Sequence, residues 1–220
     1  MTKSQPLGYL ATPTTSNGHG VLVLHAWWGL NNTIKSICNR LAEEEGYTAF
    51  APDLYHGKVA DTIPGAEALG SALDANYKQA FTEIVESAQF LHEKSGANKS
   101  GLAVIAFSLG GYYALQLADS EPNLISAVVL FYGAGGGDFG RTSVASYLGH
   151  FAENDPYENR ADVDELEKTL RKAGRPVTFH HYKGTRHWFF EPDRVDAYNL
   201  KAAELAWERT LAFLKVNFED

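Results

Sequence analysis

The chain has 220 residues, of which 45% are hydrophobic and 21% are charged. This composition is typical of a globular protein and excludes an intrinsically disordered chain. The formal net charge is −8, which disfavours a nucleic-acid partner because phosphate backbones repel an acidic protein. The apolar runs are far shorter than the ~18 residues of a membrane-spanning helix, so we expect no membrane partner.

The length fits one α/β domain over residues 1–220, with no linker or repeat inside it. Cys38 is the only cysteine and cannot form a disulfide within the chain. A reducing compartment is therefore the simpler expectation. The first six residues contain no apolar signal core, so we expect a cytoplasmic protein. No feature of the sequence indicates an oligomeric state.

Predicted strands and helices alternate along the chain. Apolar runs predict strands at residues 8–12, 21–25, 47–51, 102–107, 125–132, 145–151 and 177–182. Helical spacing of apolar residues predicts helices at 33–45, 77–93, 109–118, 163–173 and from about 193 onwards. Residues 53–75 contain several turn-forming residues and are predicted to be a loop with a short helix, forming a rim or lid. This alternation indicates a mostly parallel central sheet with helices on both faces.

Ser108 lies where a predicted buried strand meets a predicted helix. Ala106 and Gly110 stand two residues before and two residues after it. This pattern is a variant of the G-x-S-x-G nucleophile elbow, where small neighbours permit a tight turn that exposes the hydroxyl. The alternative is a serine that only caps the helix. We predict that Ser108 is a nucleophile.

A serine nucleophile needs a base, and the base needs a third group that holds it. His180 and His181 fall inside a predicted strand, where they would point to opposite faces. His187 follows that strand at its carboxyl end, which is where parallel sheets bind ligands. We therefore predict that His187 is the base.

The orienting acid is predicted to be Asp155, which follows the strand at 145–151 and precedes Pro156. Glu153 and Asp138 are the alternatives. An aspartate before proline can also serve only as a turn residue. As a carboxylate, Asp155 would fix the tautomer of His187 and stabilise its protonated form.

Two backbone amides are candidates for stabilising an oxyanion. The Leu109 amide stands at the beginning of the helix that follows Ser108. The Trp27 amide stands in the loop after the strand at 21–25. We interpret His25, which precedes this loop, as a strand-end residue that shapes it.

Several segments, taken in their order and spacing, resemble motifs of the dienelactone hydrolase family. These segments are residues 25–29, 51–55, 107–111, 131–133, 151–155, 187–189 and the helix at 206–214. The resemblance implies an α/β-hydrolase fold and a hydrolase that uses no metal or organic cofactor. It assigns the triad positions to Ser108, Asp155 and His187, and the oxyanion positions to Leu109 and Trp27.

The sequence departs from this family at three positions. Ser108 stands where the founding enzymes have cysteine, and Ala26 stands where they have a glutamate that holds the thiol. These two changes agree, because a serine has no resting thiolate to control. Glu191 stands where an arginine would bind the substrate carboxylate, and no arginine occurs between Arg40 and Arg141. We therefore expect a neutral substrate, because an anionic one would lack its bidentate partners.

Aromatic residues concentrate near the predicted site. We expect Trp28, Tyr55 and Trp188 to line an apolar substrate pocket, whereas other aromatic residues would pack in the core. The leading hypothesis is a serine hydrolase that cleaves small neutral carboxylic esters or lactones, or thioesters, through an acyl-enzyme.

The sequence alone leaves two alternative functional hypotheses open. A ligand-binding protein without catalytic activity could use the same fold. A metal site could be imagined from His180, His181, His187 and Asp155. The metal site is disfavoured because neighbouring strand residues point apart.

Overall fold

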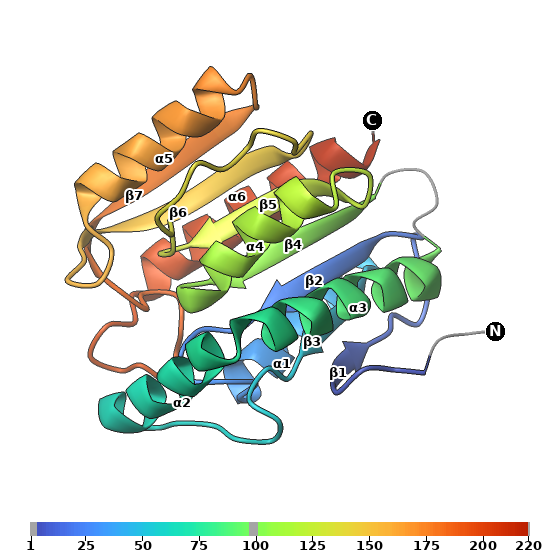
Figure 1. Ribbon diagram of the computed structural model, residues 1–220, viewed down its shortest axis with the longest axis horizontal. Coiled ribbons are helices and arrows are strands. Elements are labelled where there is room, and N and C mark those ends of the chain that lie inside the picture. Colours follow the sequence, from blue (N-terminus) through green and yellow to red (C-terminus); the bar gives the residue numbers. More distant parts are fainter. Residues whose placement is uncertain (1–3, 97–100, 220) are drawn as a thin grey trace.

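The computed structural model describes residues 4–96 and 101–219, in which seven strands form one sheet (Figure 1). The strands are β1 (Gly8–Ala11), β2 (Gly20–Leu24), β3 (Thr48–Pro52), β4 (Leu102–Phe107), β5 (Ile125–Phe131), β6 (Ser146–Asn154) and β7 (Val177–Arg186). Their order across the sheet is β1-β3-β2-β4-β5-β6-β7. β1 pairs antiparallel with β3, and every other pair is parallel. The predicted mostly parallel sheet is confirmed.

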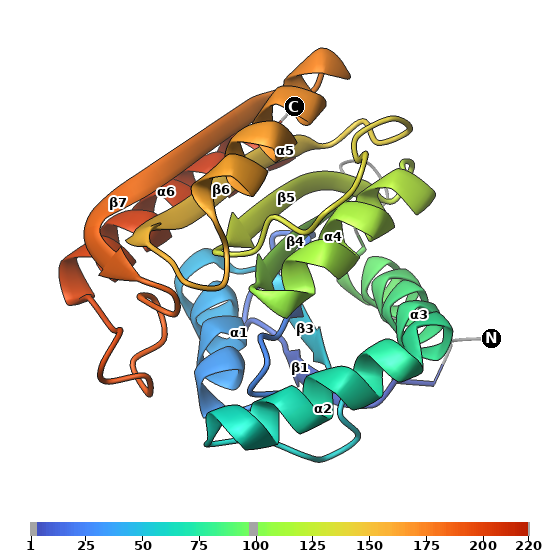
Figure 2. The same ribbon diagram turned by 60° about the vertical axis from the view of Figure 1, so that its left-hand side comes forward.

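Helices cover both faces of this sheet (Figures 1 and 2). They are α1 (Asn32–Glu45), α2 (Ile63–Ala75), α3 (Tyr77–Ser95), α4 (Leu109–Ser120), α5 (Arg160–Lys172) and α6 (Leu200–Glu219). α1 and α6 pack into one apolar cluster, and α3, α4 and α5 pack into the other. Successive β2 residues divide between the two clusters, since Val21 belongs to the first and Leu22 to the second. This alternation explains why the strand is apolar throughout.

Several element boundaries differ from the sequence prediction. β7 continues to Arg186, although residues 183–186 were predicted to be a loop. β7 is the last strand in the order of the sheet, and an edge strand tolerates polar residues because one side is solvated. β6 likewise extends to Asn154, which pairs with Arg186. The two strands therefore end together, and Asp155 and His187 follow at the same edge.

Two further differences concern helices. α6 begins at Leu200 and not near residue 193, because the Asn199 side chain accepts the amide of Ala202 and caps the helix there. Within 53–75 the helix is longer than expected. Thr62 caps it by accepting the amide of Gly65, and α2 then runs to Ala75. The helix therefore occupies more of the predicted rim than the loop does.

None of the helices within residues 4–96 and 101–219 combines the length and the apolar character needed to cross a bilayer.

Candidate active site

Ser108 occupies the turn between β4 and α4, as the sequence predicted. Its φ is 48° and its ψ is −115°, a backbone conformation that is strained for a residue with a side chain. The turn is fixed on both sides: the Ser108 amide donates to the Phe131 carbonyl at 2.9 Å, and the Gly111 amide donates to the Ser108 carbonyl at 2.8 Å. Surrounding structure therefore holds the strained residue in place.

Small residues allow neighbouring backbones to approach this turn. A Cβ atom on Gly110 would lie 2.9 Å from the Leu24 carbonyl oxygen in β2. A Cβ atom on Gly133 would lie only 2.2 Å from the Ser108 carbonyl oxygen. The sequence pattern identified Gly110, but it did not identify Gly133, which comes from a different strand-to-loop junction. The available signals were a glycine after a buried strand and the resemblance of residues 131–133 to a family motif, and neither gave its contact with Ser108.

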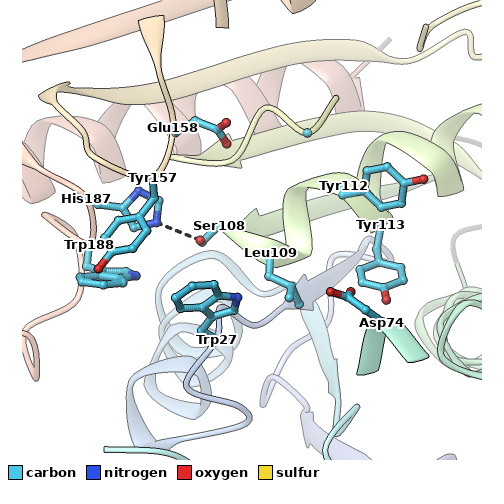
Figure 3. Close-up of a pocket in the computed structure, with 11 residues that line it drawn as sticks. Trp27, Asp74, Ser108, Leu109, Tyr112, Tyr113, Tyr157, Glu158, His187 and Trp188 are labelled. Carbon is cyan, nitrogen blue, oxygen red and sulfur yellow. Dashed lines mark hydrogen bonds between the residues drawn. The ribbon is translucent and has the colours of Figure 1, made fainter. Parts of the chain in front are cut away.

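The side chains of Ser108, His187 and Asp155 form a continuous chain of hydrogen bonds, of which Figure 3 shows the bond between Ser108 and His187. The Ser108 Oγ lies 2.8 Å from His187 Nε2. His187 Nδ1 lies 2.7 Å from Asp155 Oδ2 and 2.9 Å from Oδ1. A carboxylate can only accept, so Nδ1 carries the ring proton and Nε2 is free to accept the Ser108 hydroxyl. This arrangement can remove a proton from the serine as it attacks an electrophile.

The base and the acid are both shielded from solvent, and their orientations are fixed. The His187 and Asp155 side chains are only 3% and 4% exposed. The amides of Tyr157 and Glu158 both donate to Asp155 Oδ1 at 2.9 Å. The Tyr132 ring packs against the His187 ring with their centroids 4.9 Å apart. These contacts restrict the rotation of the imidazole.

The alternative acids are engaged elsewhere. Glu153 accepts the amide of Gly184 at 2.8 Å, and Asp138 pairs with Arg141 on the surface. Of these three carboxylates, only Asp155 contacts His187.

The remaining strand histidines do not join the site. His180 stacks with His150, whereas the next residue, His181, stacks with Phe151 on the opposite face of the sheet. The part of the chain that the structure describes contains no group of three or more histidine, cysteine or acidic residues that could hold a metal ion.

Ser108 opens into a pocket of about 290 Å³. The pocket is lined by Trp27, Asp74, Ser108, Leu109, Tyr112, Tyr113, Gly135, Tyr157, Glu158, His187 and Trp188. Both predicted oxyanion residues, Trp27 and Leu109, lie on this lining. Leu109 is the first residue of α4, where unpaired amides give the helix end a partial positive charge.

The cavity next to Ser108 brings together some of the aromatic residues predicted to line a substrate pocket and not others. Trp188 lines the pocket as expected, but Trp28 and Tyr55 do not. Trp28 is almost fully buried and lines a neighbouring groove, where its ring packs against Trp188 at 5.0 Å. Tyr55 is buried against His25 and lines a separate cavity under α2. The positions of Trp28 and Tyr55 in the sequence did not show which way their side chains point, because neighbouring residues of a loop point to different sides.

Sequence reasoning also missed several residues of the lining. Tyr157 and Glu158 follow Asp155 in the turn after β6, whereas Asp74 comes from the last turn of α2. Glu158 accepts the amide of Ala134 at 2.5 Å, and burial raises the pKa of its carboxyl. No motif marks these residues, and only the packing of α2 and α4 around the site brings Asp74 into it.

Glu191 does not face the pocket. It is fully buried, and the Tyr132 hydroxyl donates to its Oε1 at 2.8 Å. Burial raises the pKa of Glu191 to about 8. The position where the resemblance placed a substrate-binding arginine therefore holds a buried acid in contact with the tyrosine that packs on His187.

His25 is fully buried as well, and its Nδ1 contacts the Ala26 carbonyl at 2.8 Å. Burial lowers the pKa of His25, which favours the neutral ring. This position agrees with a residue that shapes the loop before Trp27.

Comparisons with known proteins agree with this fold. The model of the dienelactone hydrolase family matches residues 7–218. The chain is 36% identical to "Protein usf" of Aquifex pyrophilus, over 94% of this chain and 92% of that protein. It is 33% identical to the "Putative carboxymethylenebutenolidase" of Aquifex aeolicus, again over 94% of this chain and 92% of that protein.

A similar fold is found in the crystal structure of a dienelactone hydrolase-like promiscuous phosphotriesterase from metagenomic libraries. Its TM-score is 0.77 at 22% identity, over 93% of this chain and 87% of that one. The molecule therefore has an α/β-hydrolase fold. The chain belongs to the dienelactone hydrolase family, and it is a hydrolase.

Proposed function

We propose that the protein hydrolyses small carboxylic esters or lactones with Ser108 as nucleophile, His187 as general base and Asp155 as orienting acid. The hydrogen-bond chain from Ser108 Oγ through His187 to Asp155 carries this proposal, because the three residues converge from three separate loops. In each hydrogen bond, the donor and the acceptor are the ones that nucleophilic catalysis requires.

In the first half-reaction, Ser108 Oγ attacks the substrate carbonyl carbon while His187 Nε2 takes the hydroxyl proton. The negative charge that develops on the carbonyl oxygen would be stabilised by the backbone amides of Trp27 and Leu109. A single donor of this kind typically contributes ~3 kcal/mol to transition-state stabilisation. The tetrahedral intermediate then expels the alkoxide, which takes the proton from His187, and an acyl-serine remains.

In the second half-reaction, His187 removes a proton from water as the water attacks the acyl carbon. The acid product leaves as the proton returns to Ser108 Oγ. In a lactone the expelled alcohol stays attached to the acyl group, so one hydroxy acid is released. The whole reaction needs only water as co-substrate.

The only cysteine of the chain is a poor candidate for the nucleophile. Cys38 lies on the buried face of α1, and burial raises the pKa of its thiol to about 12. A thiol in that state is not nucleophilic at neutral pH. This supports Ser108 as the attacking group.

The charge of the pocket argues against an anionic substrate. Among the residues that the structure describes, no lysine or arginine lines the pocket next to Ser108, whereas Asp74 and Glu158 both do. A substrate carboxylate would meet like charge without a cationic partner. Uncharged esters and lactones fit this lining better.

The test is labelling with a fluorophosphonate, which reacts with an activated serine, followed by assays on aryl esters and lactones. We expect stoichiometric labelling and turnover in the wild type, and loss of both in Ser108→Ala. Thr82→Ala on the exposed side of α3 is a matched control that should retain both. Absence of labelling and of turnover in the wild type would contradict the proposal and favour a ligand-binding protein.

A further inference from the structure

The pocket extends beyond Leu109 to an end formed by Asp74 and Tyr113 (Figure 3). Asp74 comes from the last turn of α2, and Tyr113 comes from α4, five residues after Ser108. The two side chains lie on the far side of Leu109 from the Ser108 hydroxyl. This end belongs to the same pocket as the nucleophile.

The Tyr113 hydroxyl is a buried polar group that lacks a partner. The residue is 2% exposed, and within residues 4–96 and 101–219 no hydrogen-bond partner reaches its oxygen. Burial, followed by the charge of Asp74, raises the pKa of Tyr113 to about 12. An unpaired buried hydroxyl costs free energy, and a ligand in the pocket that hydrogen-bonds to it would remove that cost.

Asp74 stands at a position where its charge is unfavourable for the helix. The C-terminal end of a helix has a partial negative charge, which repels a carboxylate and attracts a cation. The last turn of α2 contains no basic residue that would compensate. A positive group of a ligand placed here would interact favourably with both the carboxylate and the helix end.

Among the described residues, basic side chains close to the site line a neighbouring cavity and not this pocket. Arg186 and Arg194 line a groove on the other side of Trp188, which Ser108 does not line. Arg194 is already paired with Asp193 at 2.8 Å and lies over the Trp28 ring. The pocket that holds the nucleophile is therefore acidic.

We propose that this pocket selects esters that carry an ammonium group, and that the ammonium binds between the Asp74 carboxylate and the Tyr113 hydroxyl. This inference rests on the proposed esterase function and specifies its substrate class. A primary ammonium has three N–H donors. One would bond to the carboxylate and another to the unpaired hydroxyl oxygen, so both groups would gain a partner.

The fold also sets the length of the substrate. Tyr113 lies five residues after Ser108, which is roughly 7 Å along a helix axis at ~1.5 Å per residue. A chain of about four to six bonds between the reacting carbonyl and the nitrogen would span this distance. Shorter amino esters would leave the ammonium short of Asp74.

The experiment measures kcat/KM for p-nitrophenyl esters of ω-amino acids with three to six carbons, corrected for spontaneous hydrolysis. Each is paired with the alkanoate ester in which methyl replaces ammonium, and with the monoester in which carboxylate replaces it. At the longer chain lengths, we expect kcat/KM for the ammonium ester to exceed that for its methyl counterpart by roughly three- to tenfold. This is the effect of a partly solvated ion pair. The carboxylate ester should be the poorest. A second series, aminoalkyl acetates, tests whether the ammonium belongs to the acyl or the alcohol side.

Two variants locate the selectivity. In Asp74→Asn and in Tyr113→Phe, the ratio of ammonium to methyl ester should fall toward one. Glu67→Gln is the matched control, because Glu67 is exposed on the same helix and does not line the pocket. It removes the same formal charge and should keep the ratio. The thermal unfolding midpoint of Tyr113→Phe should not fall, because the lost hydroxyl had no partner.

The outcomes separate this inference from the proposed function. If neutral esters are cleaved in a Ser108-dependent reaction but the ammonium esters show no advantage in either series, the ammonium site is refuted and the esterase stands. An equal loss of selectivity in Glu67→Gln would also refute it, because the effect would then reflect overall charge. If no ester is cleaved at all, both proposals fail.

Discussion

Gly133 packs against the main chain of Ser108 so closely that a methyl group on its Cα would lie 2.2 Å from the Ser108 carbonyl oxygen. The strained turn of the nucleophile thus depends on a residue 25 positions away in the sequence.

Replacement of Gly133 by alanine should therefore disturb the position of Ser108. The added Cβ would meet backbone, which cannot rotate away, so the turn must shift. We expect a loss of stability of about 1–3 kcal/mol, as for other overpacked sites. We expect kcat to fall by about a hundredfold or more, because the attacking oxygen would be misplaced. Gly136→Ala is the control, since nothing lies within 4 Å of a Cβ at that position. Similar activity of the two variants would contradict this account.

Asp155→Asn should reduce kcat by several orders of magnitude while leaving the fold intact. An amide can donate a hydrogen bond to Nδ1 and so favour the wrong tautomer of His187, in which Nε2 carries the proton. Steady-state assays and circular dichroism would measure activity and fold together. Glu153→Gln is the matched control and should remain close to the wild type, because Glu153 contacts Gly184 and not the histidine. If Asp155→Asn retains full activity, the acid role passes to another carboxylate.

Glu191→Gln should alter the dependence of stability on pH. The folded protein raises the pKa of Glu191 to about 8, well above the value of about 4.5 for an unperturbed glutamate. The Glu191 carboxyl therefore ionises more readily in the unfolded chain than in the folded one. As a result, the wild type loses stability as pH rises from about 4.5 toward 8. Glutamine stays neutral and can still accept the Tyr132 hydroxyl.

The free energy of unfolding of the variant relative to the wild type should therefore increase with pH. The expected slope is up to roughly 1.4 kcal/mol per pH unit within this window. Urea unfolding at pH 5.5, 6.5 and 7.5 would measure it. Parallel curves for the two proteins would show that Glu191 does not titrate in this way.

Tyr157→Ala should weaken substrate binding more than it slows chemistry. The Tyr157 ring packs against His187 at 5.1 Å and Trp188 at 5.0 Å, and it approaches Trp27 at 5.7 Å. Its removal would open the rim of the pocket, so we expect KM to rise by about three- to tenfold with a smaller change in kcat. Tyr157→Phe retains the ring and should resemble the wild type. A large fall in kcat with unchanged KM would instead assign the residue to positioning of His187.

Much of the fold could be predicted from local patterns. The short apolar runs of β2, β4 and β5 were identified because a strand buried on both faces has few polar residues. The helix predicted at 33–45 is observed as α1, whose ends are capped by Asn31 and Gly46 through local geometry alone. The later half was less predictable, because pairing between β6 and β7 extends both strands into polar segments.

The sequence by itself determined that Ser108 would sit in a tight turn and that His187 would follow a strand at the same edge, because strand direction and turn chemistry are local properties. Only the tertiary structure decided which carboxylate contacts His187, since Asp155, Glu153 and Asp138 all lie close to ends of strands. It likewise decided that Tyr157 and Asp74 line the pocket while Trp28 and Tyr55 do not. The physical reason is that the whole sheet, through its twist and packing, sets the direction of side chains in loops and the contacts between distant helices. No short stretch of sequence encodes this twist and packing.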